Sequence, residues 1–293
     1  MSLSCHSETG VLKKVYLKSI TKGFRNQDEI DRNWQSLNFI ARPDFHQALE
    51  EYTIFEDILR ESGAEISYFE DSDETGMDSI YCRDASIATD FGMIICRMGK
   101  PLRSGEPNAQ KQVFEKNGEK ILGVIEAPGK LEGGDVAWID RNTLAVAHGY
   151  RTNSNGFMQM EAMLSPHGIN LKQVPLPHYK GPNDVFHLMS IFSPVADDLA
   201  VVYSQLMPVF FRELLIERGY QFVEVPEEEF ESMGCNVLAL SPRKCVMVEG
   251  NPITKSRLEN AGCHVIEYKG EHISILGGGG PTCLTRPLLR FQN

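Results

Sequence analysis

Apolar and polar positions follow a pattern that repeats along the chain. Five times, an amphipathic helical stretch ends in a glycine and is followed by a short apolar strand. A residue just after a helix often adopts a left-handed conformation, which glycine accepts without steric cost. These glycines recur about every 50 residues, the scale of a structural repeat. They are Gly63, Gly118, Gly168, Gly219 and Gly262. The pattern predicts five helix–strand units.

Upstream of four of these helices, two apolar segments flank a short turn, which is typical of a β-hairpin. The predicted pairs are 85–89 with 93–97, 136–139 with 144–147, 186–192 with 199–203, and 237–240 with 245–248. A fifth hairpin would pair Val11–Leu17 with the C-terminal segment that carries Cys283. The predicted unit is therefore strand, strand, helix, strand. Because the fifth unit needs both chain ends, we interpret residues 1–293 as a single domain. Five unrelated helix–strand junctions in an α/β protein remain the alternative.

Composition narrows the classes of function. The 293 residues are 42% hydrophobic and 24% charged, as in ordinary folded proteins. No apolar run reaches the roughly 20 residues that span a bilayer, and the first residues do not resemble a signal peptide. We therefore expect a cytoplasmic protein with no membrane partner.

The net charge of −11 argues against nucleic acid as a partner and is consistent with a cationic small substrate. The seven cysteines include no Cys-x-x-Cys pair, so we expect no disulfide framework, no metal and no cofactor.

Reactive and polar side chains stand at matching places in the repeat. Repeats around a common axis bring equivalent positions together at the centre, as in a propeller. The start of each predicted hairpin carries one such residue: Asp84, Glu132, His187, Asn236 and Cys283. Four glycines and Pro-Thr precede Cys283, and glycines suit a place where a ligand approaches the backbone closely. Taken singly, a histidine or a cysteine is more often part of the core. The matching positions are what indicate an active site.

The same segments resemble the guanidine-modifying enzymes of the pentein fold, an α/β five-bladed propeller of ββαβ repeats around a pseudo-fivefold axis. This superfamily includes dimethylarginine dimethylaminohydrolases, arginine deiminases and amidinotransferases. The matching motifs are Cys-Arg-Asp at 82–84, Glu-Gly-Gly-Asp at 132–135, Phe-His-Leu at 186–188, Gly-Cys-Asn-Val-Leu at 234–238 and Gly-Gly-Gly-Gly-Pro-Thr-Cys at 277–283. They occur in the family's order and cover essentially the whole chain. The resemblance implies a hydrolase that attacks the guanidinium carbon of a small, arginine-like substrate.

A guanidinium is a planar, delocalised cation, so its chemistry needs a thiolate, carboxylates for the N–H groups and an acid for the leaving nitrogen. We expect Cys283 to be the nucleophile, which forms a thiouronium-like covalent intermediate. His187 would protonate the leaving nitrogen and then activate water. Asp84 would accept hydrogen bonds from the guanidinium. The resemblance implies that Glu132 holds the histidine. For Asp135, a catalytic role and a backbone-bonded turn position both stay open.

The resemblance also implies residues for the far end of the substrate. Arg103 and Arg151 match positions that hold the α-carboxylate, and we expect both at the pocket rim, with a solvated surface arginine as the alternative. Asp78 matches a position that takes the α-ammonium. Tyr81 could lay its ring against the guanidinium plane, although core packing explains it equally well. Residues 21–27 resemble a mobile lid, with a plain surface loop as the alternative.

One position separates the activities within this superfamily. Arginine deiminases and amidinotransferases carry an aspartate two residues after the histidine, whereas this chain has Met189 there. A thioether offers no acceptor to bare amino hydrogens but tolerates methyl groups. This favours an N-methylated arginine as substrate, with citrulline and an alkylamine as products. An arginine deiminase or dihydrolase, an amidinotransferase and a non-catalytic pentein-fold binding protein are the alternatives. The oligomeric state, a homodimer included, stays open.

Overall fold

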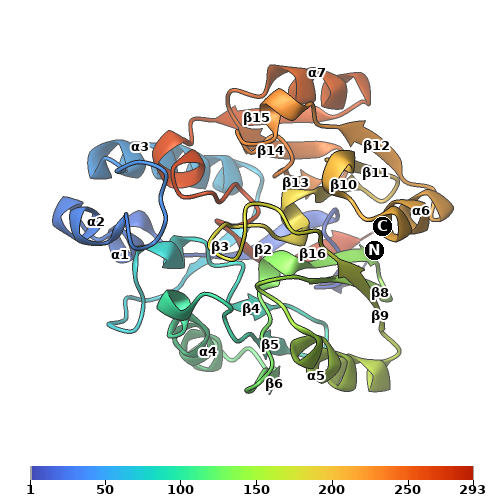
Figure 1. Ribbon diagram of the computed structural model, residues 1–293, viewed down its shortest axis with the longest axis horizontal. Coiled ribbons are helices and arrows are strands. Elements are labelled where there is room, and N and C mark those ends of the chain that lie inside the picture. The colour runs from blue at the N-terminus through green and yellow to red at the C-terminus, as the bar shows by residue number, and fades with distance from the viewer. Residues whose placement is uncertain (1, 293) are drawn as a thin grey trace.

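The structure is a computed structural model that describes residues 2–292. Among these residues, five small sheets lie in the middle of the molecule and the helices lie outside them (Figure 1). In four of these sheets one pair of strands is antiparallel, and the four-stranded sheet has two such pairs. In every one of them a further strand, which follows a helix, runs parallel to its neighbour. The predicted ββαβ repeat and the α/β fold class are confirmed.

The strands of the five sheets are β1 (Ser2–Ser4), β2 (Val11–Leu17), β3 (Glu65–Tyr68) and β16 (Arg286–Gln292); β4 (Ser86–Ile87), β5 (Met93–Ile95) and β6 (Ile121–Val124); β7 (Val136–Asp140), β8 (Thr143–His148) and β9 (Asn170–Pro175); β10 (Phe192–Ala196), β11 (Leu199–Val202) and β12 (Gln221–Glu224); and β13 (Leu238–Ser241), β14 (Lys244–Val248) and β15 (His264–Tyr268). The helices are α1 (Ile20–Gly23), α2 (Gln27–Asn33), α3 (Phe45–Glu61), α4 (Glu106–Lys116), α5 (Ser154–Leu164), α6 (Val209–Glu217) and α7 (Pro252–Asn260). None of the helices in the described part of the chain is long and apolar enough to cross a membrane.

The repeat glycines end their helical segments in the way that the sequence predicts. All five have a positive φ, between 76° and 83°. Helix α3, for example, begins after Asp44, whose side chain accepts a hydrogen bond from the backbone N–H of Gln47. It ends at Ser62, and Gly63 then reverses the chain into β3. Each glycine therefore directs the chain from an outer helix back to its sheet.

Strands from both ends of the chain meet in one sheet. β2 pairs antiparallel with β16, with Tyr16 opposite Arg286 and Val11 opposite Phe291. β1 then pairs with the other edge of β16, with Ser2 opposite Gln292. The predicted fifth hairpin is confirmed. This closure is what the interpretation of residues 1–293 as one domain requires.

Two local predictions are wrong. The first strand of the fourth unit begins at Phe192 rather than at residue 186, and it runs through Pro194, which was expected in the turn. A register shift after Pro194 accommodates the missing backbone N–H. Residues 21–27 are not the plain loop of the alternative interpretation, because they contain most of α1 and the start of α2, while the lid stays a prediction. Arg25 between these helices donates hydrogen bonds to the backbone oxygens of Ser72 and Thr75.

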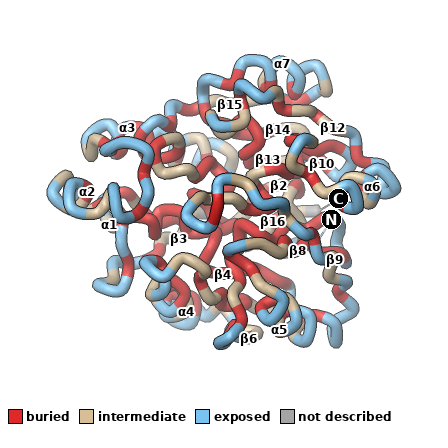
Figure 2. The backbone as a smooth tube through the Cα atoms, in the orientation of Figure 1, coloured by how far each residue is buried: buried red, intermediate tan, exposed pale blue. Residues whose placement is uncertain are grey.

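The distribution of buried residues follows the arrangement of inner sheets and outer helices. Buried residues gather along the central strands, and exposed residues lie on the outer faces of the helices (Figure 2). One apolar cluster joins three neighbouring sheets and includes Ala145, Val201 and Cys245. Close packing of this kind leaves little freedom to the strand ends. The segments that lead into the central strands are therefore held in fixed positions.

We expect Gly168→Ala to lower the free energy of unfolding by about 1–2 kcal/mol, because alanine is strained in the left-handed conformation. Nothing lies within 4 Å of the position that the new Cβ would take, so the backbone strain is the main cost. Gly76 has an equally open surrounding but a φ of −102°, which makes Gly76→Ala the matched control. Urea unfolding measures both variants. Equal stability of the two would contradict the repeat interpretation of Gly168.

Candidate active site

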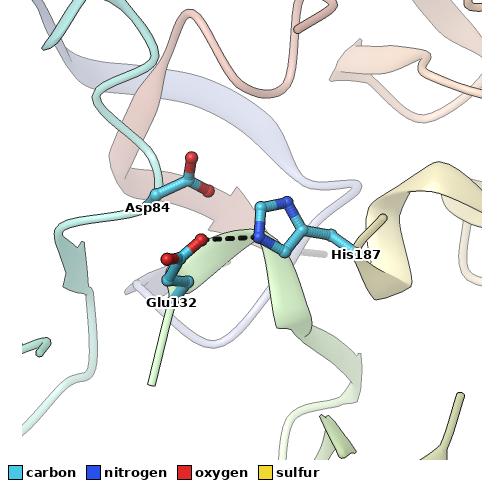
Figure 3. Close-up of side chains that lie close together, drawn as sticks. All are labelled: Asp84, Glu132 and His187. Carbon is cyan, nitrogen blue, oxygen red and sulfur yellow. Dashed lines mark hydrogen bonds and ion pairs between the residues drawn. The ribbon is translucent and has the colours of Figure 1, made fainter. Parts of the chain in front are cut away.

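The five matching residues of the sequence pattern all lie just before the first strand of a unit. Asp84 precedes β4, Glu132 precedes β7, His187 precedes β10, Asn236 precedes β13 and Cys283 precedes β16. The sheets bring these short segments together. One carboxylate or imidazole atom from each of Asp84, Glu132 and His187 lies within 4.8 Å of the others (Figure 3). The amide Nδ2 of Asn236 lies 3.5 Å from the Sγ of Cys283.

Glu132 and His187 form a buried pair. The imidazole Nε2 lies 2.8 Å from Oε2 of Glu132, as the dashed line in Figure 3 shows. The same oxygen accepts from Nη1 of Arg151 at 3.3 Å. The other oxygen, Oε1, accepts from the backbone N–H groups of Gly99 and Lys100. The contact expected from the family resemblance is present, and every side of this carboxylate is occupied.

This pair sets the protonation of the histidine. Burial alone would lower the pKa of His187, but the negative charges of Asp84, Asp135 and Glu132 outweigh it and raise the pKa to about 9. Burial would likewise raise the pKa of Glu132, yet the hydrogen bond and charge of His187 and the charge of Arg151 lower it. At neutral pH the site therefore holds an imidazolium that can donate a proton.

The thiol of Cys283 is neutral in the free protein. Its side chain is buried, and burial raises its pKa to about 11, with a further upward contribution from the charge of Asp84. Hydrogen bonds from Thr282 and Asn236 and the charge of Arg83 oppose this shift. A cation placed beside the sulfur would favour the thiolate. The geometry thus suits a nucleophile that ionises when a cationic ligand is bound.

Arg103 does not lie at the pocket rim, and that prediction is wrong. Its guanidinium is buried, with Nε and Nη2 donating to Glu106, each at 2.8 Å. Nη1 donates to Oδ2 of Asp84 at 2.6 Å, and Nη2 also reaches the backbone oxygen of Tyr81. The other oxygen of Asp84 accepts from the backbone N–H of Gly134 at 3.0 Å. Arg103 therefore orients Asp84.

Arg151 is also buried rather than at a rim. Besides Glu132, it donates from Nη2 to the backbone oxygen of Asp184 at 3.1 Å. Its Nε is buried without a hydrogen-bond partner among the described residues. Asp78, expected to take an ammonium group, already has one, because Nζ of Lys100 lies 2.6 Å from its Oδ2.

Tyr81 explains the run of glycines before Cys283. Its ring is buried against the backbone of that run, and a Cβ at Gly279 would lie 2.4 Å from the ring. At Gly277 a Cβ would lie 1.9 Å from the hydroxyl oxygen. The hydroxyl itself has no hydrogen-bond partner within residues 2–292. Any larger residue at these glycines would displace the tyrosine from the site.

Two spaces meet at Cys283. The larger has a volume of about 320 Å³, and its walls include His187, Met189 and several apolar side chains: Ile40, Phe186, Phe230, Met233 and Leu276. The smaller, of about 10 Å³, is bounded by polar side chains: Asp78, Tyr81, Asp84, Lys100, Arg103 and Arg151. It has room for about one water molecule. Val185 forms a wall of both, and it belongs to the connection 176–187, which contains no helix or strand.

Sequence reasoning missed some residues of the site. Lys100 and Glu106 carried no signal, because a lysine in a turn and a glutamate at a helix start are ordinary surface features. Asp135 is fully buried, where its oxygens accept from the backbone N–H of Leu188 and from Oγ1 of Thr152. This favours the backbone-bonded interpretation, in which Asp135 positions the segment that carries His187.

Asp84, Glu132 and His187 also offer the kinds of donor atom that bind zinc. Both oxygens of Asp84 are engaged, as are both oxygens of Glu132. The raised pKa of His187 favours an imidazolium at neutral pH, which would have to lose a proton before it could bind a metal ion. The arrangement fits proton transfer better than it fits metal binding.

Comparisons with known proteins agree with this chemistry. A family profile described as eukaryotic N,N-dimethylarginine dimethylhydrolase matches residues 22–290. The chain is 27% identical to the uncharacterized protein YkgA of Bacillus subtilis, covering 98% of this chain and 96% of that protein. It is 26% identical to N(G),N(G)-dimethylarginine dimethylaminohydrolase of Pseudomonas aeruginosa, covering 86% and 91%. A crystal structure of the Pseudomonas enzyme with citrulline has a TM-score of 0.77 at 22% identity, covering 96% of this chain and 100% of that one. The N-terminal domain of the cyanobacterial arginine dihydrolase ArgZ has a TM-score of 0.77 at 16% identity, covering 93% and 97%.

We expect iodoacetamide to alkylate Cys283 slowly at neutral pH and faster at each step up to pH 9.5, because the pKa of the thiol is raised to about 11. A small free thiol with an ordinary pKa of roughly 8.5 serves as reference and should begin to level off in this range. Peptide mass spectrometry after timed exposure measures the adduct at this one position. A plateau between pH 7 and 8 would mean that the free protein already holds a thiolate.

Proposed function

The chain belongs to the family of N,N-dimethylarginine dimethylhydrolases, and from this premise we propose that it hydrolyses an N-methylated arginine to citrulline and an alkylamine. It is a hydrolase that acts on carbon–nitrogen bonds of linear amidines. The observation that carries the choice of substrate is Met189, which forms a wall of the larger space beside His187. A carboxylate at this place would bind bare amino hydrogens, whereas a thioether suits methyl groups.

The first half-reaction begins with binding of the guanidinium. Asp84 accepts its N–H groups and fixes its plane over Cys283, a contact that Arg103 prepares by holding the carboxylate. The positive charge beside the sulfur favours loss of the thiol proton to solvent, and the resulting thiolate attacks the guanidinium carbon and forms a carbon–sulfur bond. His187, protonated at neutral pH, gives its proton to the alkylated nitrogen. The carbon–nitrogen bond breaks, and a thiouronium on Cys283 remains.

The second half-reaction uses the same histidine as a base. His187 has lost its proton and now takes one from a water molecule, whose oxygen bonds to the thiouronium carbon. The carbon–sulfur bond breaks, the remaining hydroxyl proton of the attacking water passes to the sulfur, and Cys283 returns to the neutral thiol of the free protein. The substrate carbon keeps the new oxygen, so the guanidine has become a urea, as in citrulline. Glu132 stabilises the imidazolium in the resting state and fixes the ring through both steps.

The larger space supports an alkylamine as leaving group. His187 lines this space and does not line the smaller one, so the nitrogen that it protonates points into the larger. About 320 Å³ has room for a dimethylamino group, and the walls combine apolar side chains with polar ones such as Asn183, Asp184 and Glu231. Beside His187, the apolar side chain of Met189 offers no acceptor to the amino hydrogens of arginine. Arginine deimination is the second candidate, supported by the similarity to arginine deiminases such as that of Listeria welshimeri, at 24% identity.

Cys283→Ser is expected to reduce turnover of methylarginine below a few per cent of wild type, because serine has no accessible anion near neutral pH. Cys5→Ser is the matched control, since Cys5 lies outside both spaces, and should keep full activity. His187→Gln should also reduce citrulline release strongly, because it removes both the acid of the first half-reaction and the base of the second. Citrulline release measures these outcomes. Normal turnover by Cys283→Ser would remove this residue from the nucleophile role.

Met189→Asp is expected to shift preference from methylated arginine toward arginine by at least roughly tenfold in kcat/KM, about 1.4 kcal/mol. The carboxylate supplies an acceptor for amino hydrogens and is unfavourable against methyl groups. Met189→Leu keeps the wall apolar and should leave the ratio near that of wild type. Steady-state rates with both substrates give the ratios. A wild-type preference for arginine that Met189→Asp leaves unchanged would replace the proposal with arginine deimination.

A further inference from the structure

Asn236 comes from a different repeat unit than Cys283, and its side chain contacts the sulfur of that cysteine. Asn236 lies just before β13, whereas Cys283 lies just before β16. Both side chains are buried, and the amide Nδ2 of Asn236 donates to Sγ at 3.5 Å. We propose that Asn236 is a further catalytic residue, whose amide N–H stabilises negative charge on the sulfur each time that charge appears in the reaction. This inference rests on the proposed function, in which Cys283 is the nucleophile.

The other end of the amide fixes its orientation. Oδ1 of Asn236 accepts from the backbone N–H of Thr282 at 3.0 Å and from Oγ1 of Thr282 at 2.9 Å. In the opposite orientation the amide NH₂ would face a backbone N–H, and two donors cannot share a hydrogen bond. Nδ2, which carries the hydrogens, therefore faces Sγ. A sulfur anion at Cys283 thus meets a donor that is already aligned with it.

Gly280 allows the turn before Cys283 to approach Asn236 this closely. A Cβ at position 280 would lie 2.5 Å from Oδ1 and 2.6 Å from Cγ of Asn236. The backbone oxygen of Gly280 also accepts from the backbone N–H of Cys283 at 3.0 Å, within the turn that carries the nucleophile. Any larger residue at this position would push the amide away from that turn. The last glycine of the run is therefore required by the contact between Asn236 and the cysteine.

The amide of Asn236 is the donor that faces the sulfur. Burial and the charge of Asp84 raise the pKa of Cys283, while hydrogen bonds from Thr282 and Asn236 act in the opposite direction. Oγ1 of Thr282 lies farther from Sγ, at 3.8 Å, than the amide nitrogen does. The single hydrogen of that hydroxyl is also directed at Oδ1 of Asn236. Thr282 therefore acts on the sulfur mainly by holding the amide.

A hydrogen bond of this kind favours the sulfur anion over the neutral sulfur. Hydrogen bonds with a charged partner are roughly twice as strong as neutral ones. In the proposed mechanism Sγ is anionic before it attacks the guanidinium carbon. Negative charge develops on it again as the carbon–sulfur bond breaks, until the proton of the attacking water reaches it. An interaction that is stronger in these charged states than in the resting thiol and the covalent intermediate contributes to the rate.

Two substitutions at position 236 test the role of the amide hydrogen. Asn236→Asp keeps the shape and the acceptor for Thr282 but places a carboxyl oxygen beside the sulfur. Asn236→Leu has a similar shape and removes the donor without adding a charge. We expect both to lower kcat for methylarginine by about 10–100-fold, the usual contribution of a hydrogen bond to a charged group, with KM near that of wild type. Urea unfolding shows whether each variant is folded.

The thiol can also be followed without any substrate. Alkylation of Cys283 by iodoacetamide should be slower in both variants at neutral pH and at each step up to pH 9.5. We expect a decrease of at least roughly threefold, because less thiolate is present and its greater nucleophilicity compensates only in part. Peptide mass spectrometry after timed exposure measures the adduct. A purely structural role of Asn236 in substrate binding would not change this rate.

Asn153→Asp is the matched control. Oδ1 of Asn153 likewise accepts from two backbone N–H groups, but its Nδ2 donates to the backbone oxygen of Pro128 rather than to a sulfur. Asn153 lines neither of the two spaces that meet at Cys283. The control variant should therefore keep the wild-type kcat and the wild-type rate of alkylation.

The outcomes separate this inference from the proposed function. If kcat and the alkylation rate of Asn236→Leu stay within about threefold of wild type, the inference is overturned and the proposed function stands. A loss in Asn236→Asp alone would also overturn it, because the added charge rather than the missing donor would be the cause. The same holds if kcat falls while alkylation is unchanged. If the wild type hydrolyses no methylated arginine but both variants slow alkylation, the proposed function fails and the role of Asn236 toward the sulfur stands.

Discussion

The buried pair of Glu132 and His187 is the interaction on which the rest of the site depends. One oxygen of the carboxylate holds the imidazole and Arg151, and the other holds two successive backbone N–H groups. A fully buried carboxylate is tolerated only when its charge and lone pairs are matched in this way. Because the matching partners come from three different segments, the requirement to satisfy one side chain fixes the relative positions of all of them.

Other charged side chains around Glu132 and His187 also form ion pairs. Arg103 lies between the carboxylates of Asp84 and Glu106, and Lys100 lies against Asp78. In the free protein, the carboxylates of the site are thus paired with lysine and arginine side chains of the same chain. When a guanidinium substrate enters the site, the carboxylate of Asp84 is already oriented by Arg103 and is also already paired with it. A bound guanidinium would therefore share the carboxylate of Asp84 with Arg103, and this sharing needs no large rearrangement of the backbone.

The sequence predicts the features that depend on local conformation and spacing. Gly168 and its counterparts are recognisable because only a left-handed backbone requires glycine there, and the regular interval gives the repeat. The equivalence of Glu132, His187 and Cys283 follows from that repeat. The burial of Arg103 and Arg151 could not be predicted, because it depends on acceptors that distant segments supply. Pro194 misled the prediction of a strand for a related reason: an irregularity in β10 itself, directly after Pro194, is invisible in the sequence and makes room for the proline.

The sheet that joins both ends of the chain also has a kinetic meaning. The pairing of β16 with β2 joins residues far apart in the chain, and folds that depend on such contacts form more slowly. Cys283 precedes β16, and its Sγ lies beside the amide of Asn236, so the position of this thiol depends on that pairing. Partly folded chains, and native molecules that transiently lose this one sheet, therefore contain the thiol of Cys283 without its neighbour Asn236. The accessibility of this thiol thus reports on whether β2 and β16 are paired.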